Sequence, residues 1–129
     1  THLPFMAWKD WVFKLAEFKY GIHLMQTYAA GSFMMNCGYL GIPCIGYNHT
    51  DTQRNIFPDL SIDQDDLDTG RKLAKKLVND KDFYDECSKK AIKNFNEHSS
   101  EIAFNKWKEN FFNKVDDLIA GKISYIGDK

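Results

Sequence analysis

One turn and the short helix predicted after it hold the residues best suited to bind an anion. Thr27, Ala30, Gly31 and Ser32 lie in the turn or open the helix, and small residues there let another group approach the backbone. The exposed N–H groups and positive dipole end of a helix favour an anion, of which phosphate is the natural candidate. Asn36 follows Ser32 by four residues on the same helix face, where its amide could bond a ribose hydroxyl. The alternative is a glycine-tightened turn that only packs.

A second polar group follows the next predicted strand. Asp51 and Gln53 lie in a segment, residues 47–58, that we expect to be a polar loop. Ligands of doubly wound proteins bind at the carboxyl ends of the strands, so this loop and the Gly31 turn should share one edge of the sheet. Carboxylate and amide side chains there are placed to bond the hydroxyl groups of a ligand. An ordinary polar turn is the alternative interpretation.

Apolar periodicity and turn residues predict the elements that position these groups. The predicted elements are a helix with an aromatic face over 9–18, a strand over 22–25, a helix over 32–40 ended by Gly41, strands over 43–46 and 60–62, and three helices that begin at Asp63, at Asp80 and at Ser99 or Ser100, the last ending at Gly121. Apolar strands between helices predict an α/β fold with a Rossmann-like parallel sheet flanked by helices. Three strands are few for such a sheet. We therefore expect the second half of a larger doubly wound domain, or a sheet completed by a partner, including a second copy at an open edge.

Composition and charge exclude several classes of protein. The formal net charge of −1 and the pI of about 6.4 give no electrostatic case for a nucleic-acid partner. No apolar run approaches the roughly 20 residues of a membrane span, and no signal peptide is visible. Cys37, Cys44 and Cys87 lack paired spacing, so we expect free thiols, used as small core residues in a reducing, cytoplasmic compartment.

Some residues that could carry chemistry are better explained by structure. Asp63 and Asp65 could ligate a divalent cation, but a long amphipathic helix is predicted directly after them, and acids belong at its start. We therefore expect no metal site and no cofactor. His23, inside a predicted strand, is expected to pack rather than to ligate. The apolar stripes of the closing helices, such as Phe104 and Trp107, are expected to be core.

The segment from Gly31 to Gly46 resembles the donor-binding segment of GT-B glycosyltransferases. In that family a strand leads into a glycine-containing turn, a helix and a Gly-x-Pro step. A residue seven before the proline, commonly glutamate, holds the ribose of the nucleotide sugar, and counting back from Pro43 gives Asn36. Retaining members usually carry a second glutamate eight residues earlier, where this chain has Tyr28.

A second segment adds to the resemblance. Residues Asp51 to Asn55 are similar to the Asp/Gln-plus-Asn segment of inverting GT-B enzymes, which grips the hydroxyls of the donor sugar. The resemblance covers residues 4–120. It implies that residues 1–129 form one nucleotide-sugar-binding half of a GT-B C-terminal domain, with closing helices over 64–120. It further implies a UDP- or GDP-linked donor and a glycan or other acceptor held by a domain outside this chain, so the chain alone should be inactive.

Two alternatives share the same fold. UDP-sugar 2-epimerases have a Thr-Glu-Arg run after the corresponding strand, and Thr52-Gln53-Arg54 stands nearby in this chain. A non-catalytic binding or assembly module could have kept the fold and lost the chemistry, and the missing glutamates favour it slightly. An epimerase would act on a nucleotide sugar without an acceptor, and a scaffold would bind no nucleotide.

Overall fold

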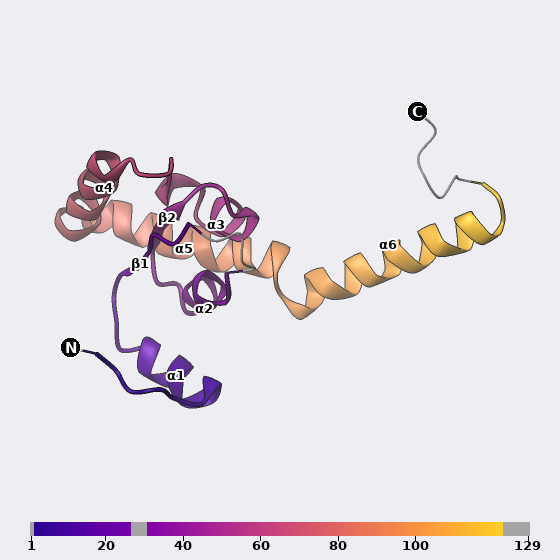
Figure 1. Ribbon diagram of the computed structural model, residues 1–129, viewed down its shortest axis with the longest axis horizontal. Helices are drawn as coiled ribbons and strands as arrows, with labels where there is room; N and C mark the ends of the chain where they lie inside the picture. The colour runs from indigo at the N-terminus through magenta and orange to yellow at the C-terminus, as the bar shows by residue number, and fades with distance from the viewer. Residues whose placement is uncertain (1, 27–30, 123–129) are drawn as a thin grey trace.

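The computed structural model describes residues 2–26 and 31–122 of the 129-residue chain (Figure 1). Its elements are α1 (Trp8–Leu15), β1 (Gly21–His23), α2 (Ser32–Leu40), β2 (Cys44–Tyr47), α3 (Asp51–Ile56), a 3-10 turn η1 (Pro58–Leu60), β3 (Ser61–Ile62), α4 (Leu67–Asn79), α5 (Lys81–His98) and α6 (Glu101–Ile119). Within the described residues, no helix is long and apolar enough to cross a membrane.

The strands form one small parallel sheet, which confirms the predicted α/β class. The strand order is β1-β2-β3, with Gly21 opposite Cys44 and Gly46 opposite Ser61. The middle strand, β2, is buried along its whole length. A strand covered on both faces is expected to be a continuous apolar run rather than an alternating one, and the CIGY sequence of β2 satisfies that requirement.

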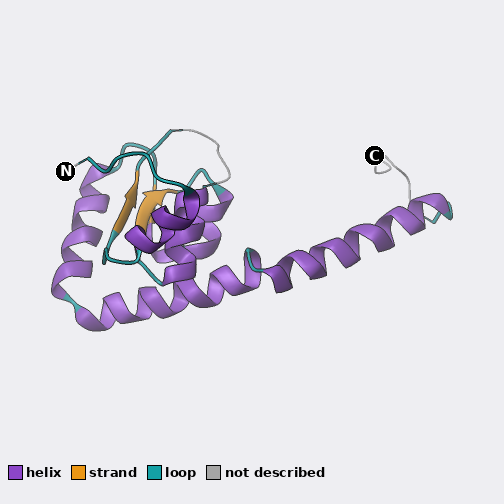
Figure 2. Ribbon diagram, turned by 90° about the horizontal axis from the view of Figure 1, so that it is seen from below, coloured by secondary structure: helices purple, strands orange, loops and turns teal. Residues whose placement is uncertain are grey.

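Side-chain alternation along β2 defines two faces of the sheet. Cys44 and Gly46 lie on the face covered by α2 and α3, because a Cβ on Gly21 would meet the Cys37 and Cys44 sulfurs at 3.1 Å and a Cβ on Gly46 would meet Gln53. The helix α5 packs against α2 and α3 on that side (Figure 2). Ile45 lies on the opposite face, which α4 covers over β2.

The three cysteines are buried and free, as their spacing predicts. Hydrogen bonding with Cys37 and burial raise the pKa of the Cys44 thiol well above its usual value. Burial, followed by the charge of Asp59, raises the pKa of Cys87 to about 11. Cys44 and Cys87 are therefore protonated at neutral pH, and they serve as small core residues rather than nucleophiles.

Several predicted boundaries are confirmed. The helix α2 has the predicted bounds, and Gly41 ends it in the left-handed conformation with φ of 68°. Asp80 accepts a hydrogen bond from the Phe83 N–H at the start of α5, and Ser100 accepts one from Ala103 at the start of α6. His23 packs as expected, since its ring stacks on Phe33 with the ring centroids 5.8 Å apart.

Other boundaries differ from the prediction. The expected polar loop over 47–58 contains the helix α3 and the turn η1. The helix α4 begins at Leu67 rather than after Asp63, because Asp66 caps it by accepting from the Thr69 N–H. The helix α1 ends at Leu15, three residues before the expected end.

The prediction that every helical stripe is core is wrong for α6. This helix projects from the rest of the chain (Figures 1 and 2) and has no buried residue. Its apolar side chains instead stack on one another, with ring centroids 6.1 Å apart for Phe104 and Trp107 and 5.4 Å apart for Trp107 and Phe111. The aromatic face of α1 is also open in part, since Trp8 and Phe13 are each 70% exposed.

Gly46 is the glycine on which the sheet depends most directly. A Cβ added there would lie 2.6 Å from Gln53 Oε1 and 3.1 Å from the His23 carbonyl oxygen. The Gln53 side chain is held in place because its Nε2 donates to the Cys44 and Leu60 carbonyls at 2.9 and 3.4 Å. No small adjustment can make room for a methyl group.

We predict that Gly46→Ala destabilises the protein by about 1–3 kcal/mol, the usual cost of overpacking a core. The control is Gly70→Ala in α4, where a Cβ meets only the flexible end of Ile62 at 3.1 Å. That change should leave stability unchanged or raise it, since alanine favours a helix by about 1 kcal/mol over glycine. Urea denaturation measures both variants. Equal stabilities for Gly46→Ala and the parent chain would contradict the role given to the Gly46–Gln53 contact.

Candidate functional site

The candidate site lies where β1 and β2 end and α2 and α3 begin. Gly31 is the N-cap residue of α2, with φ of 78° and ψ of 49°, and it has no side chain to cap the helix. This left-handed conformation strongly favours glycine. The first turn of α2 contains no acidic residue. The first backbone N–H groups of this nine-residue helix therefore lie at the carboxyl edge of the sheet. No acidic side chain in the first turn of α2 competes with an anion for them.

The start of α3 lies directly against this turn. A Cβ on Gly31 would lie 3.3 Å from the Cβ of Thr52, the second residue of α3. Thr50 is the N-cap residue of α3, but its side chain caps no helix N–H. The Thr50 hydroxyl is buried and has no hydrogen-bond partner among the described residues. The starts of α2 and α3 and the buried Thr50 hydroxyl therefore all follow the carboxyl ends of the neighbouring strands β1 and β2.

Charged side chains lie exposed on the same segment. Asp51, in the first turn of α3, forms an ion pair with Arg54, and both side chains are largely exposed. Arg54 also donates from Nη1 to the Asn48 carbonyl at 2.5 Å. An exposed ion pair of this kind contributes little to stability, so both groups can rearrange around a ligand at low cost. Ser32, at the start of α2, is exposed as well.

Asn36 occupies a different surface. It lines an apolar groove of about 580 Å³ between α1 and α2, together with Trp8, Val12 and Tyr39. Gly31 and Ser32 do not line this groove. Asn36 is half-buried, one helical turn beyond Ser32. The structure therefore places its amide beside α1, and a ligand reaching both Gly31 and Asn36 would extend along the outer side of α2.

Gln53 points into the protein rather than toward the ligand edge. Its side chain is fully buried, and its amide nitrogen is used by the Cys44 and Leu60 carbonyls. Gln53 Oε1 has no hydrogen-bond partner among the described residues. The geometry gives Gln53 a supporting role beneath the site. Thr27 and Ala30, also predicted as ligand residues, lie outside the described residues.

Sequence reasoning missed Thr50 as a site residue and Arg54 as the ion-pair partner of Asp51. A signal for Thr50 was present, because Thr-Asp is a typical N-cap and first-turn pair. The polar composition of residues 47–58 predicts a loop, and a loop contains no helix for this pair to begin. Thr50 matters because a buried hydroxyl without a partner is costly and therefore uncommon.

The acidic residues before α4 serve the connection after β3. Asp63 accepts a hydrogen bond from Asn48 Nδ2 at 2.5 Å. Asp65, with φ of 65°, accepts from the Tyr47 hydroxyl at 3.5 Å and from Gln26 Nε2 at 3.3 Å. The parts of the chain that the structure describes contain no cluster of three His, Cys, Asp or Glu side chains able to hold a metal ion.

The chain was compared with models of protein families, with curated proteins and with solved structures. None of the three comparisons finds a match. The structure itself shows a small α/β domain with a three-stranded parallel sheet flanked by helices.

Proposed function

We propose that this chain is the donor-binding part of a glycosyltransferase, built as half of a GT-B C-terminal domain. The observation that carries the proposal is the left-handed Gly31 at the start of α2, on the carboxyl edge of a parallel sheet. At this position backbone N–H groups can approach the diphosphate of a nucleotide sugar closely. The sugar is transferred to an acceptor held by polypeptide outside residues 1–129.

Different residues near Gly31 bind different parts of the proposed nucleotide-sugar donor. The first turn of α2, with Ser32, binds the diphosphate, and Asn36 bonds the ribose further along the same helix. Asp51 accepts hydrogen bonds from the hydroxyls of the donor sugar. Arg54 is released from Asp51 when the donor binds and then faces the phosphate. Gln53 supports this arrangement from below by fixing α3 to β2.

A matched pair of glycine variants tests the diphosphate site. Gly31 and Gly41 begin and end the same helix, both with positive φ, and a Cβ at either would contact a flexible side chain, Met34 or Ile92. Alanine should cost a similar 1–2 kcal/mol of stability at each position, the approximate penalty of a left-handed residue. Only Gly31→Ala should weaken binding of UDP or GDP, by about tenfold or more, which corresponds to one lost charge-assisted hydrogen bond.

Calorimetric titration of the intact protein with UDP and GDP measures this difference, and thermal unfolding measures the stability cost. If both variants lose affinity in proportion to their lost stability, Gly31 has only a structural role. If the parent protein binds neither nucleotide, the whole proposal fails, and a scaffold with the same fold remains.

Nucleotide binding should not depend on a divalent cation, because the proposed anion site consists of backbone N–H groups and a helix dipole. The same titration in the presence of a chelator should give an unchanged dissociation constant. A strict magnesium requirement would contradict this site and would favour Asp63 and Asp65 as ligands of the cation.

Alanine variants of Asp51 and Gln53 should distinguish a residue that binds the sugar from one that only supports the fold. In the intact enzyme Asp51→Ala should lower kcat/KM by about one to two decades, since it removes a hydrogen bond between a carboxylate and a hydroxyl. It should leave stability nearly unchanged, because the side chain is exposed, and it should not weaken nucleotide affinity, because the freed Arg54 remains available to the phosphate. Gln53→Ala should instead destabilise the fold by about 2–4 kcal/mol, through a cavity and lost hydrogen bonds. Full turnover by Asp51→Ala would exclude it as a sugar ligand.

A further inference from the structure

The sheet face that α4 covers is only partly covered over β1 by the described residues. Ile22 lies on this face, because its neighbours Gly21 and His23 contact α2 on the other side. The helix α4 covers β2 and β3 there, with Gly70 against Ile62. Ile22, by contrast, is 60% exposed. Strands of parallel sheets are normally buried on both faces, so among the described residues β1 lacks cover on this face.

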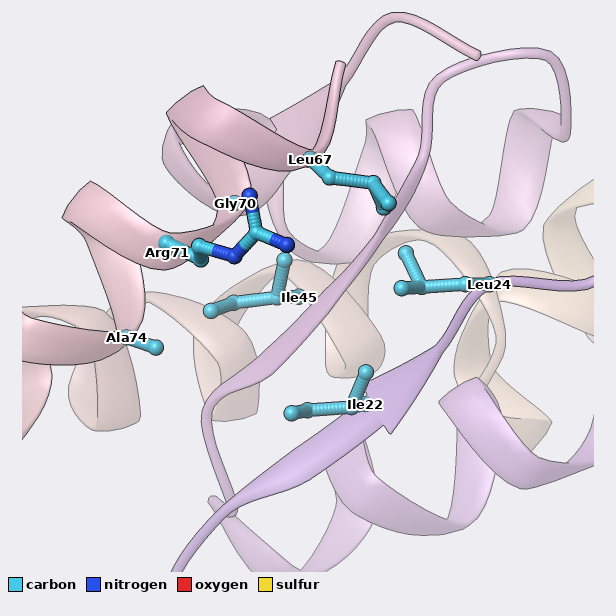
Figure 3. A pocket seen from close by; sticks show the side chains of 7 residues that line it. All are labelled: Ile22, Leu24, Ile45, Leu67, Gly70, Arg71 and Ala74. Carbon is cyan, nitrogen blue, oxygen red and sulfur yellow. The ribbon is translucent and has the colours of Figure 1, made fainter. Parts of the chain in front are cut away.

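The open face forms a continuous apolar groove between β1 and α4, which we call the β1–α4 groove. It consists of two hollows of about 210 and 180 Å³ that share Ile22, Ile45 and Ala74. Figure 3 shows the first, with Ile22 and Leu24 along one wall and Leu67 and Ala74 along the other. Val78, 64% exposed, continues the α4 wall into the second hollow. The apolar area left exposed belongs to a surface that is normally covered.

The rim of the β1–α4 groove carries more cationic than acidic side chains. Arg71 lies over the first hollow beside Ile45, as Figure 3 shows, and forms an exposed ion pair with Asp68. Lys19 and Lys81 line a neighbouring hollow that shares Val78 with the groove and also contains Asp85, the ion-pair partner of Lys81. The helix α4 has four cations and one acidic residue along its length. Two copies of this chain placed groove to groove would bring these cationic rims together. The charge therefore favours an occupant with an acidic flank over a second copy.

Handedness identifies the kind of element that fits. The crossovers from β1 to β2 through α2, and from β2 to β3 through α3, place both helices on the opposite face. Parallel crossovers are right-handed in almost all proteins. Successive strands run across the sheet from β1 toward β3, with their connecting helices on the face opposite α4. A connecting helix on the α4 face therefore requires successive strands that run across the sheet in the reverse direction, beyond the free edge of β1. Its strand would pair with the free edge of β1, since β1 is an edge strand within the described residues.

We propose that the β1–α4 groove is the docking surface for one β–α unit from polypeptide outside residues 1–129. The strand of that unit pairs in parallel with the free edge of β1. The helix that follows it lies in the groove, with an apolar stripe on Ile22, Ile45 and Val78 and an acidic flank toward Arg71. This proposal depends on packing and charge alone, so it stands whether or not the site binds a nucleotide.

A photoreactive side chain in the groove of the intact protein tests the proposal. With benzoylphenylalanine in place of Val78, irradiation should give one crosslinked peptide that is helical in its periodicity, carries Asp or Glu on one flank and follows an apolar strand. Benzoylphenylalanine in place of Ile119, which is 81% exposed on α6, is the control and should not capture that peptide. Capture of another copy of residues 1–129, of a segment without that pattern, or of nothing overturns the proposal.

Charge reversal provides a second measurement. Arg71→Glu should lower the Tm of the intact protein by about 2–4 °C more than Lys72→Glu, because only Arg71 lines the groove. Arg71 also forms an exposed ion pair with Asp68, whereas Lys72 only lies near Asp66. Asp68→Ala removes the same ion pair without changing Arg71, so the shift it causes is subtracted from that of Arg71→Glu. Equal shifts would show that no acidic flank faces Arg71. If the parent protein binds neither UDP nor GDP but the expected peptide is still crosslinked from position 78, the proposed function is rejected and this docking surface is supported.

Discussion

The buried amide of Gln53 is the interaction on which the sheet and the site both depend. Its nitrogen joins the carbonyl of Cys44 in β2 to that of Leu60 just before β3, and so fixes α3 under the strand it follows. Only a glycine at position 46 leaves space for the amide. A buried polar side chain is tolerated when it is bonded, and this one replaces apolar packing with two directional contacts. It thereby fixes the position of α3 relative to β2.

This fixed position decides where the ligand edge lies. Because α3 is fixed to β2, Thr52 lies against Gly31 and brings the start of α3 to the start of α2. The space beside the left-handed turn at Gly31 is tightly filled, since a Cβ there would overlap the Met34 methyl group and would lie 3.3 Å from the Thr52 Cβ. A site made mainly of backbone depends on such packing for its shape. Thr50, the N-cap residue of α3, keeps a hydroxyl without a partner among the described residues near this edge, whereas the unpartnered Gln53 Oε1 lies against Gly46 in the interior.

Much of the fold could be predicted from the sequence, because flanking glycines and caps define several elements. Gly31 and Gly41 delimit α2, and Asp80 and Ser100 begin two later helices. The helix α3 was missed because it is short and its sheet-facing side includes Gln53, which does not contribute to an apolar stripe. Of the candidate site, the start of α2 directly after Gly31 could be predicted, whereas the burial of Gln53 could not. The stripe of α6 shows the same limit, since periodicity reveals which face is apolar but not what covers it.

The open face of β1 and the candidate site are consequences of one topology. A strand added at the edge of β1, with its helix on the α4 face, would reverse the direction in which strands follow one another across the sheet. Such a reversal separates the two adjacent connections at the carboxyl ends of the strands and leaves a crevice there. In this chain that crevice would open beside the end of β1, at the edge where Gly31 begins α2. If the proposed β–α unit docks at β1, the same added strand would place a helix in the β1–α4 groove and would form one side of the crevice beside Gly31.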